Sequence, residues 1–433
     1  MIVLIHQHAV RLRSFLAGTP LRLTFLSNGA LFGLSIVTSV LMARLLGPTD
    51  RGTVARIMYW PAITSGLFCL SLNEAVVIVL GRDSRRRSDR IRTALFLSGV
   101  LAVLASAALF VTYPFLLGPT SKPLVQQSRA FAFTFISVNL LSMILIAEDQ
   151  SIGRFGRYNA LRVLQQVCLL VGLVILWFTS TTTPPVMLLV IAASLAAPFS
   201  ARIVNYLGSD SGRVCLSDVR ELLRTGCRIQ VLNVSGYIST QLDLALLSFL
   251  LPARDFGLYA VAMAVGSAHT SIIGPSLSAV EFPRLAALPE RAIAMKQAMD
   301  AVKRPFRFSL ACSVVVPPIA LLAVPLVYGK DYSGAALPAV ILSVGMGARS
   351  FRSYFSYAAR AVGLLRIALI AEWAAAGATV VLLPVLVTWL GLTGATIGVT
   401  IANWLGLSVL LFQLSRNSGL SIRQFVFQRE AIV

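Results

Sequence analysis

Charged residues are scarce in this chain: Asp, Glu, Lys and Arg make up 12% of its 433 residues, whereas 57% are apolar. A water-soluble domain carries about 25% charged residues to cover its surface, so the composition excludes an ordinary soluble protein. Apolar runs of about 20 residues recur along the chain, and each is long enough to cross a bilayer as a helix. They are also too long for the alternating strands of a membrane β-barrel.

The residues and motifs of metal sites and enzymes are also few. The sequence has three histidines and five scattered cysteines without a CxxC pair, so no local metal spacing exists. It contains no GxxxxGK(S/T), HExxH or GxSxG motif. We therefore expect no metal, no cofactor and no enzymatic activity, and an ATP-driven pump is excluded.

The apolar runs predict an all-α, polytopic membrane protein with about twelve transmembrane helices. The first run follows Arg11, Arg13 and Arg22 without a small-residue cleavage site, so we interpret it as an uncleaved span. The expected spans are 23–43, 54–80, 93–117, 129–148, 160–179, 185–206, 229–251, 256–281, 306–328, 334–357, 364–389 and 394–415.

Basic residues alternate strongly between the two sides of this arrangement. With the N-terminus in the cytoplasm, most of the 37 lysines and arginines fall in cytoplasmic segments. The other side keeps Arg44, Arg51, Arg56, Lys122, Arg129, Arg254 and Lys330. This pattern predicts that both termini are cytoplasmic. It also accounts for the net charge of +20 without a nucleic-acid partner, and leaves contact with anionic membrane lipid as a generic role.

The stretch Asn28–Ala55 resembles Asn233–Ala260, 205 residues further along, without a gap. The identical positions include Asn28 and Asn233, Leu45-Leu46 and Leu250-Leu251, Asp50 and Asp255, Gly52 and Gly257, and Ala55 and Ala260. We interpret this as a duplication that gives two pseudo-symmetric six-helix bundles around a central cavity. The expected boundaries are 1–206 for the first bundle, 207–228 for a cytoplasmic amphipathic connector, and 229–433 for the second bundle with a short basic tail.

Ionisable residues inside spans are costly and often functional. Asp243 is the deepest acid, and it is either a structural partner of a neighbouring helix or an ion-coupling group. His269 is either a packed neutral histidine or a proton-coupling residue. Glu372 lies about two turns into its span and is a further coupling candidate.

Five further polar residues are candidates for the substrate path. Arg44 flanks the first outer turn, where snorkelling to headgroups competes with a role in transport. Arg349 and Arg352 share one helix face, and anchoring at the cytoplasmic rim is the plain alternative. Asn28 and Asn233 occupy equivalent positions, where they either line the path or join neighbouring helices.

Four segments of the sequence resemble a known family of membrane proteins. ARLLGPTDRGTVA, QLDLALLSFLLPARDFGLYAVA and LVYGKDYSGAALPAVILSVG are similar to the polysaccharide transporter branch of the multidrug/oligosaccharidyl-lipid/polysaccharide (MOP) flippase superfamily. GLTGATIGVTIANWLG looks like the same family's last span. The motif positions carried over, most of them structural, are Arg44, Gly47, Asp50, Gly52, Asp243, Gly257, Tyr259, Gly329, Gly391 and Gly394.

The resemblance implies a flippase that moves a polyprenyl-pyrophosphate-linked oligosaccharide across a bacterial inner membrane for lipopolysaccharide or exopolysaccharide synthesis, by alternating access. It implies a lipid-linked oligosaccharide as substrate, with a polysaccharide polymerase and chain-length machinery as partners. The middle of the first and seventh spans lacks the arginines that a pyrophosphate path leads us to expect. A cation-coupled multidrug antiporter and a peptidoglycan-precursor flippase of the same superfamily remain alternatives. A membrane glycosyltransferase is a third class, but its acidic metal motif is absent from the sequence.

Overall fold

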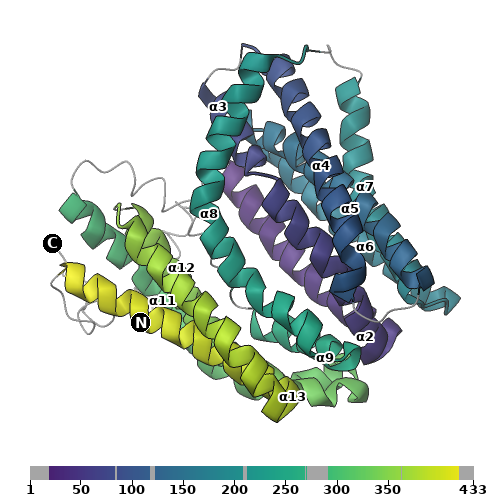
Figure 1. Ribbon diagram of the computed structural model, residues 1–433, viewed down its shortest axis with the longest axis vertical. Coiled ribbons are helices and arrows are strands. Elements are labelled where there is room, and N and C mark those ends of the chain that lie inside the picture. The colour runs from purple at the N-terminus through teal and green to yellow at the C-terminus, as the bar shows by residue number, and fades with distance from the viewer. Residues whose placement is uncertain are drawn as a thin grey trace. The chain divides into compact units, whose positions relative to one another are not determined.

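The computed structural model describes residues 19–82, 85–117, 122–207, 212–268, 270, 291–361 and 363–418, and the regular elements in these ranges are helices (Figure 1). The chain divides into two compact units. Unit 1 contains the described residues up to Leu41 together with Trp60–Val231, and unit 2 contains Met42–Tyr59 and the described residues from Leu232 onward. The expected boundary at 206–229 differs from this division, because Met42–Tyr59 packs with the later part of the chain.

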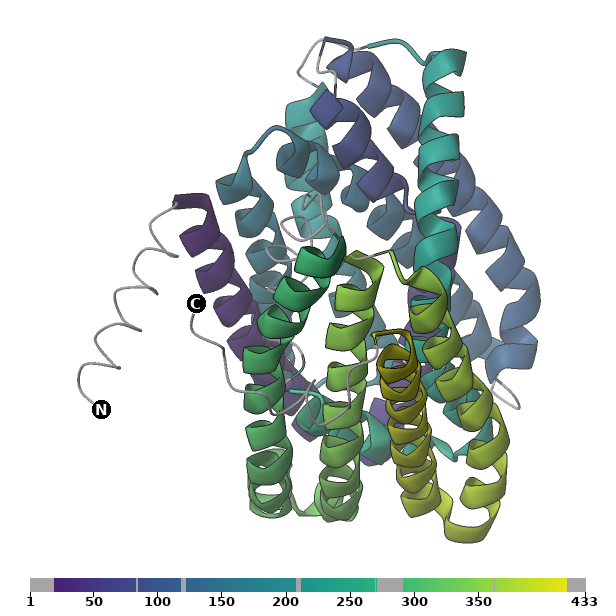
Figure 2. The ribbon, with the colours of Figure 1, turned by 90° about the vertical axis from the view of Figure 1, so that its left-hand side faces the viewer.

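Unit 1 is built from long apolar helices. They are the two ends of α2 (Thr19–Phe68), α3 (Leu72–Arg82), α4 (Arg87–Leu117), α5 (Lys122–Ser151), α6 (Phe155–Thr179), α7 (Pro184–Leu207) and the first turns of α8 (Leu216–Leu250). Helix α5 contacts α3, α4 and α7, and α6 contacts α7, so neighbouring helices lie side by side (Figure 2). Their outer faces expose large apolar side chains such as Phe115 and Phe178, as lipid-facing surfaces do.

The first two expected spans are parts of an interrupted helical stretch. Helix α2 bends at Gly47, whose φ of 68° and ψ of 172° are left-handed and suit a residue without a side chain. The helix then stops at Phe68, and α3 starts at Leu72 after a turn in which Leu70 and Ser71 also have positive φ. The expected span 54–80 is therefore broken near its centre.

Unit 2 contains the second half of α8 and the following helices. They are α9 (Ala253–Gly266), α11 (Arg291–Ala323), the π-helix η1 (Val324–Tyr328), the 3-10 helix η2 (Lys330–Ala335), α12 (Ala336–Ala361) and α13 (Leu365–Ser418). Helix α12 is central, because it contacts α9, α11 and α13. Helix α13 contains the last two expected spans, joined by a bend at Gly391 with φ 55°.

Eight helical stretches within the described residues are long and apolar enough to cross a membrane. Two of them, Leu26–Gly81 and Leu365–Arg416, each contain two of the expected spans. Helices α8 and α9 are not among the eight, and most of the eighth expected span after Gly266 lies outside the described residues. The all-α membrane architecture is thus confirmed, whereas the count of about twelve spans and the two six-helix bundles stay predictions.

The connector expected at 207–228 is not a separate helix where the structure describes it. Helix α8 begins at Leu216 and continues to Leu250 as one element. Its first turns pack on unit 1, with Leu222 buried beside Leu72, Val76 and Ile91. The chain therefore passes from unit 1 to unit 2 inside a continuous helix.

The segment Met42–Tyr59 approaches α9 so closely that only glycine fits at two positions. A Cβ added to Gly52 would lie 1.7 Å from the carbonyl oxygen of Ala253, and a Cβ added to Gly257 would lie 2.0 Å from that of Pro48. Gly52 and Gly257 are equivalent positions of the sequence repeat, and so are Pro48 and Ala253. The contact is therefore reciprocal, as a local two-fold axis produces.

Candidate functional site

Asp243 is buried in α8 within unit 2 and has partners on two other helices. Its Oδ2 accepts a hydrogen bond from the Tyr259 hydroxyl at 3.3 Å and lies 4.0 Å from Nη1 of Arg349. Its Oδ1 accepts the backbone N–H of Leu244 at 2.9 Å. Both carboxylate oxygens therefore have donors, as a buried acid requires.

Arg349 of α12 also contacts the backbone of α8. Its Nη2 donates to the carbonyl oxygen of Thr240 at 2.7 Å. The guanidinium thus bridges the carbonyl of Thr240 and the carboxylate of Asp243, less than one turn apart on α8. These two contacts of Arg349 orient α12 so that the face carrying Arg349 lies against α8.

Arg352, one turn further along α12, pairs with Glu372 of α13. Its Nη2 lies 3.3 Å from Oε2 of Glu372 and donates to Oγ of Ser239 at 3.2 Å. The Arg352 side chain is 1% exposed. Its Nε and Nη1 have no hydrogen-bond partner among the described residues.

Gly406 in the last part of α13 makes room for this guanidinium. A Cβ at Gly406 would lie 2.6 Å from Nη1 of Arg352 and 2.7 Å from the Cβ of Ala375. The sequence therefore places a glycine where an arginine enters a core that also contains Phe351 and Leu407. We call Asp243, Tyr259, Arg349, Arg352 and Glu372 the unit 2 charge network.

The unit 2 charge network is electrically balanced, with two carboxylates opposite two guanidiniums. In a region of low dielectric constant, each charge is stabilised by its partner and is costly without it. A cation entering the site would have to displace an arginine, whereas an anion would meet arginines that already have carboxylate partners. Arg349 and Arg352 both point toward buried carboxylates within unit 2.

The remaining predicted site residues lie in separate places. Asn28 accepts a hydrogen bond from Nη1 of Arg162 at 3.1 Å within unit 1, which joins α2 to α6. Asn233 is half-buried in the unit 2 part of α8. His269 lies outside the described residues. A transport role for Asn28, Asn233 or His269 therefore stays a prediction.

Arg44 caps a helix end of unit 2. Its Nε donates to the carbonyl oxygen of Val327 at 2.8 Å and its Nη2 to that of Leu326 at 3.1 Å. Arg56 similarly donates to the carbonyl of Leu251 at 2.7 Å, at the end of α8. Carbonyls at helix ends lack intrahelical donors, and a cation there also complements the helix dipole. These arginines therefore bind Met42–Tyr59 to unit 2.

Unit 1 contains a second charge network that the sequence analysis missed. Glu148 and Asp149 are buried at the end of α5. Arg87 of α4 lies 2.9 Å, through Nε, from Oε1 of Glu148, and Arg157 of α6 lies 3.6 Å from Oδ2 of Asp149. Arg202 of α7 is close to both acids, with its Nε 3.2 Å from Asp149. The sequence signal that could have predicted this network is a pair of adjacent acids at the end of one span, together with arginines at the ends of three other spans.

These helices adopt the fold of known lipid flippases and multidrug transporters. The structure titled lipid II flippase MurJ, inward closed conformation, superposes with a TM-score of 0.72 at 15% identity, over 91% of this chain and 86% of that one. A mutant of the Vibrio cholerae MATE transporter VcmN superposes with a TM-score of 0.63 at 15% identity, over 94% and 98% of the two chains. An inward-facing MATE transporter of the MOP superfamily gives 0.62 at 18% identity, over 90% and 94%.

The family of the chain is established by its sequence. Residues 22–288 match the profile of the family described as polysaccharide biosynthesis protein, which is more than half of the chain. The chain therefore belongs to that family, and the resemblance to the polysaccharide branch of the MOP superfamily is confirmed. No curated protein matches the chain in a sequence comparison.

Proposed function

We propose that this protein is a flippase that moves a polyprenyl-pyrophosphate-linked oligosaccharide repeat unit from the cytoplasmic to the outer face of a bacterial inner membrane. The observation that carries the proposal is the match of residues 22–288 to a polysaccharide biosynthesis family. The likeness to the fold of a lipid II flippase supports it. The product serves the synthesis of surface or exported polysaccharide, together with a polymerase and chain-length machinery.

Transport proceeds by alternating access, with both termini in the cytoplasm. The asymmetric distribution of arginines supports this topology. In unit 1, arginines of α4, α6 and α7 contact the Glu148–Asp149 pair, and this clustering supports the proposal that these helix ends share one side of the membrane. An anion that moves outward across an inside-negative membrane gains about 2.3 kcal/mol per charge per 100 mV, so the electric field favours export of a pyrophosphate.

A drug antiporter is disfavoured by the unit 2 charge network. Cationic drugs need an acid without a resident counter-ion, and Asp243 already has Arg349 at 4.0 Å. A peptidoglycan-precursor flippase shares the substrate chemistry proposed for this chain and differs in the sugar.

The test is genetic and chemical. We expect deletion of the gene to abolish surface polysaccharide and to accumulate the saccharide-linked carrier lipid in the inner leaflet, where an added glycosidase does not reach it in intact cells. Returning the wild-type gene is expected to restore surface polysaccharide and to remove the accumulated carrier lipid. Loss of viability with unchanged surface glycan would instead indicate a peptidoglycan precursor. Dye resistance with unchanged glycan would indicate drug export.

A further inference from the structure

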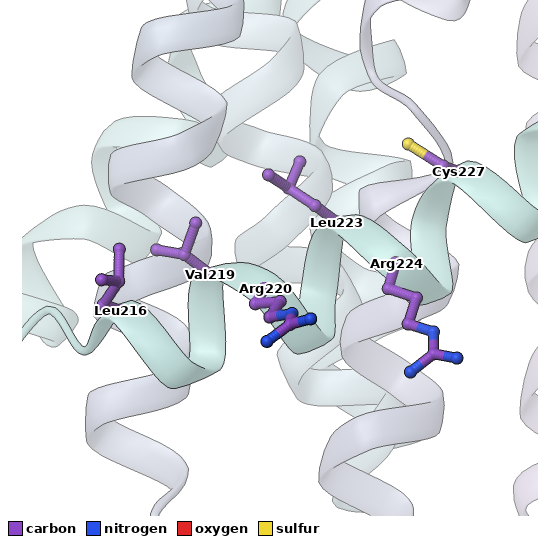
Figure 3. A pocket seen from close by; sticks show the side chains of 6 residues that line it. All are labelled: Leu216, Val219, Arg220, Leu223, Arg224 and Cys227. Carbon is purple, nitrogen blue, oxygen red and sulfur yellow. The ribbon is translucent and has the colours of Figure 1, made fainter.

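The first three turns of α8 carry a shallow and widely open hollow of about 580 Å³ on the surface of unit 1, which we call the groove. Figure 3 shows the six side chains that line it, all from this one helix. They are Leu216, Val219, Arg220, Leu223, Arg224 and Cys227. None of them takes part in the unit 2 charge network, and the proposed function assigns them no role.

The acids of α8 at this point already have partners. Asp218 lies 3.2 Å from Arg86, which immediately precedes α4, and Glu221 lies 3.5 Å from Arg90 of α4. The carboxylate of Asp218 raises the pKa of Arg86. Neither acid forms an ion pair with Arg220 or Arg224, because Arg86 and Arg90 already engage them.

Arg220 and Arg224 differ from the arginines that pair with Glu148 and Asp149. Arg87, Arg157 and Arg202 each have a carboxylate partner. Neither Arg220 nor Arg224 forms an ion pair or a side-chain hydrogen bond within the described part of the chain. The two guanidiniums, one helical turn apart, therefore form a dication without a protein counter-charge.

An apolar strip runs beside this arginine pair. In Figure 3 the side chains of Leu216, Val219, Leu223 and Cys227 point to one side of α8, and those of Arg220 and Arg224 point to another. Leu216 is 83% exposed, which is acceptable for a chain that spans a membrane when lipid covers it. The groove therefore offers a hydrocarbon contact and a double cationic contact next to each other.

We propose that this groove is a loading site that captures the isoprenoid diphosphate of the lipid-linked substrate in the cytoplasmic leaflet, a role that rests on the proposed function. Residues at i and i+4 are neighbours on a helix surface, so both guanidiniums can reach the same diphosphate. Guanidinium–phosphate bonds are charge-assisted and directional. The apolar strip contacts the first isoprene units, and the saccharide extends into water.

Cys227 supplies a reporter inside the groove. In the full-length protein, Cys69, Cys168, Cys215 and Cys312 are replaced by serine, and the protein is reconstituted in phosphatidylcholine nanodiscs. The labelling rate of Cys227 by N-ethylmaleimide is measured against increasing farnesyl diphosphate, a short isoprenoid diphosphate. We expect the probe to slow labelling several-fold. Arg220→Gln and Arg224→Gln each raise the half-protecting concentration about tenfold, which corresponds to about 1.4 kcal/mol. The matched control Arg228→Gln, on the same helix but outside the groove lining, leaves it unchanged.

Two results would overturn the loading site. One is protection by farnesyl diphosphate that does not depend on Arg220 and Arg224. The other is equal protection by phosphatidylglycerol at the same mole fraction, which would identify a general anionic-lipid contact. Unfolding curves of the variants check that these surface substitutions leave the fold intact.

Cell assays separate this proposal from the proposed function. In a deletion strain, the double variant Arg220→Gln/Arg224→Gln is expected to lower surface polysaccharide strongly, with Arg228→Gln at the wild-type level. Full export of polysaccharide by the double variant would contradict the loading site but would not contradict the proposed flippase function. If the wild-type gene itself restores no glycan, the flippase proposal fails, and with it the substrate role of the groove, whatever the nanodisc experiment shows.

Discussion

The ion pair between Arg352 and Glu372 allows a sharp test of how the unit 2 charge network stabilises the protein. Replacing one partner by an apolar residue leaves the other charge buried without compensation. For a pair as deeply buried as this one, the free energy of unfolding is expected to fall by about 3–5 kcal/mol for Arg352→Met or Glu372→Leu alone. The double variant removes both charges and is expected to regain most of that loss, ending within about 1–2 kcal/mol of the wild type.

The measurement is a double-mutant cycle on purified protein, with unfolding by sodium dodecyl sulfate in mixed micelles. Arg366→Met is the control, because Arg366 is an exposed arginine near the start of α13; we expect it to change stability by less than about 0.5 kcal/mol. Additive losses in the cycle would refute the reasoning, since they would mean that the two charges do not stabilise each other. A stable double variant that no longer exports glycan would show that the pair serves transport as well as folding.

Three further predictions concern other parts of the molecule. Gly52→Ala is expected to lower the free energy of unfolding by about 1–3 kcal/mol, because the new methyl group meets a backbone carbonyl. The control is Gly33→Ala in the same helix, where the added methyl group has open space, and equal melting temperatures for the two variants would contradict the close contact at Gly52. Asp243→Asn is expected to reduce surface polysaccharide at normal protein levels, because Arg349 loses its counter-charge; full wild-type output would remove Asp243 from the mechanism. Arg202→Leu is expected to destabilise unit 1 by about 3–5 kcal/mol, because Arg202 pairs with two buried acids; a normal yield of monodisperse protein with an unchanged melting temperature would show that the unit 1 network is dispensable.

Hydropathy predicted the helices well because lipid selects apolar residues over the whole length of a span. The bends at Gly47 and Gly391 lie at the turns where the sequence places glycine between two apolar runs. The break after Phe68 was not predictable, because the residues Cys69, Leu70 and Ser71 continue an apolar run.

The site was only partly predictable for a different reason. Asp243 and Glu372 stand out in the sequence because an acid is rare inside a span. Their partners do not, because Arg349 is 106 residues from Asp243 and its position near a span end allows snorkelling as a simpler account. Which arginine is neutralised and which stays free, as at Arg220, depends on the packing of helices that are distant in the sequence.

The fastening of Met42–Tyr59 to unit 2 constrains the order in which the protein can be assembled during synthesis. Arg44 donates to the carbonyl oxygens of Leu326 and Val327, and Gly52 packs against Ala253 and Gly257. The ribosome therefore releases the first hairpin into the membrane long before its binding surface exists. Neither half of the gene, expressed alone, encodes everything that this hairpin needs, so the two halves are expected to mature only when they are produced in the same cell.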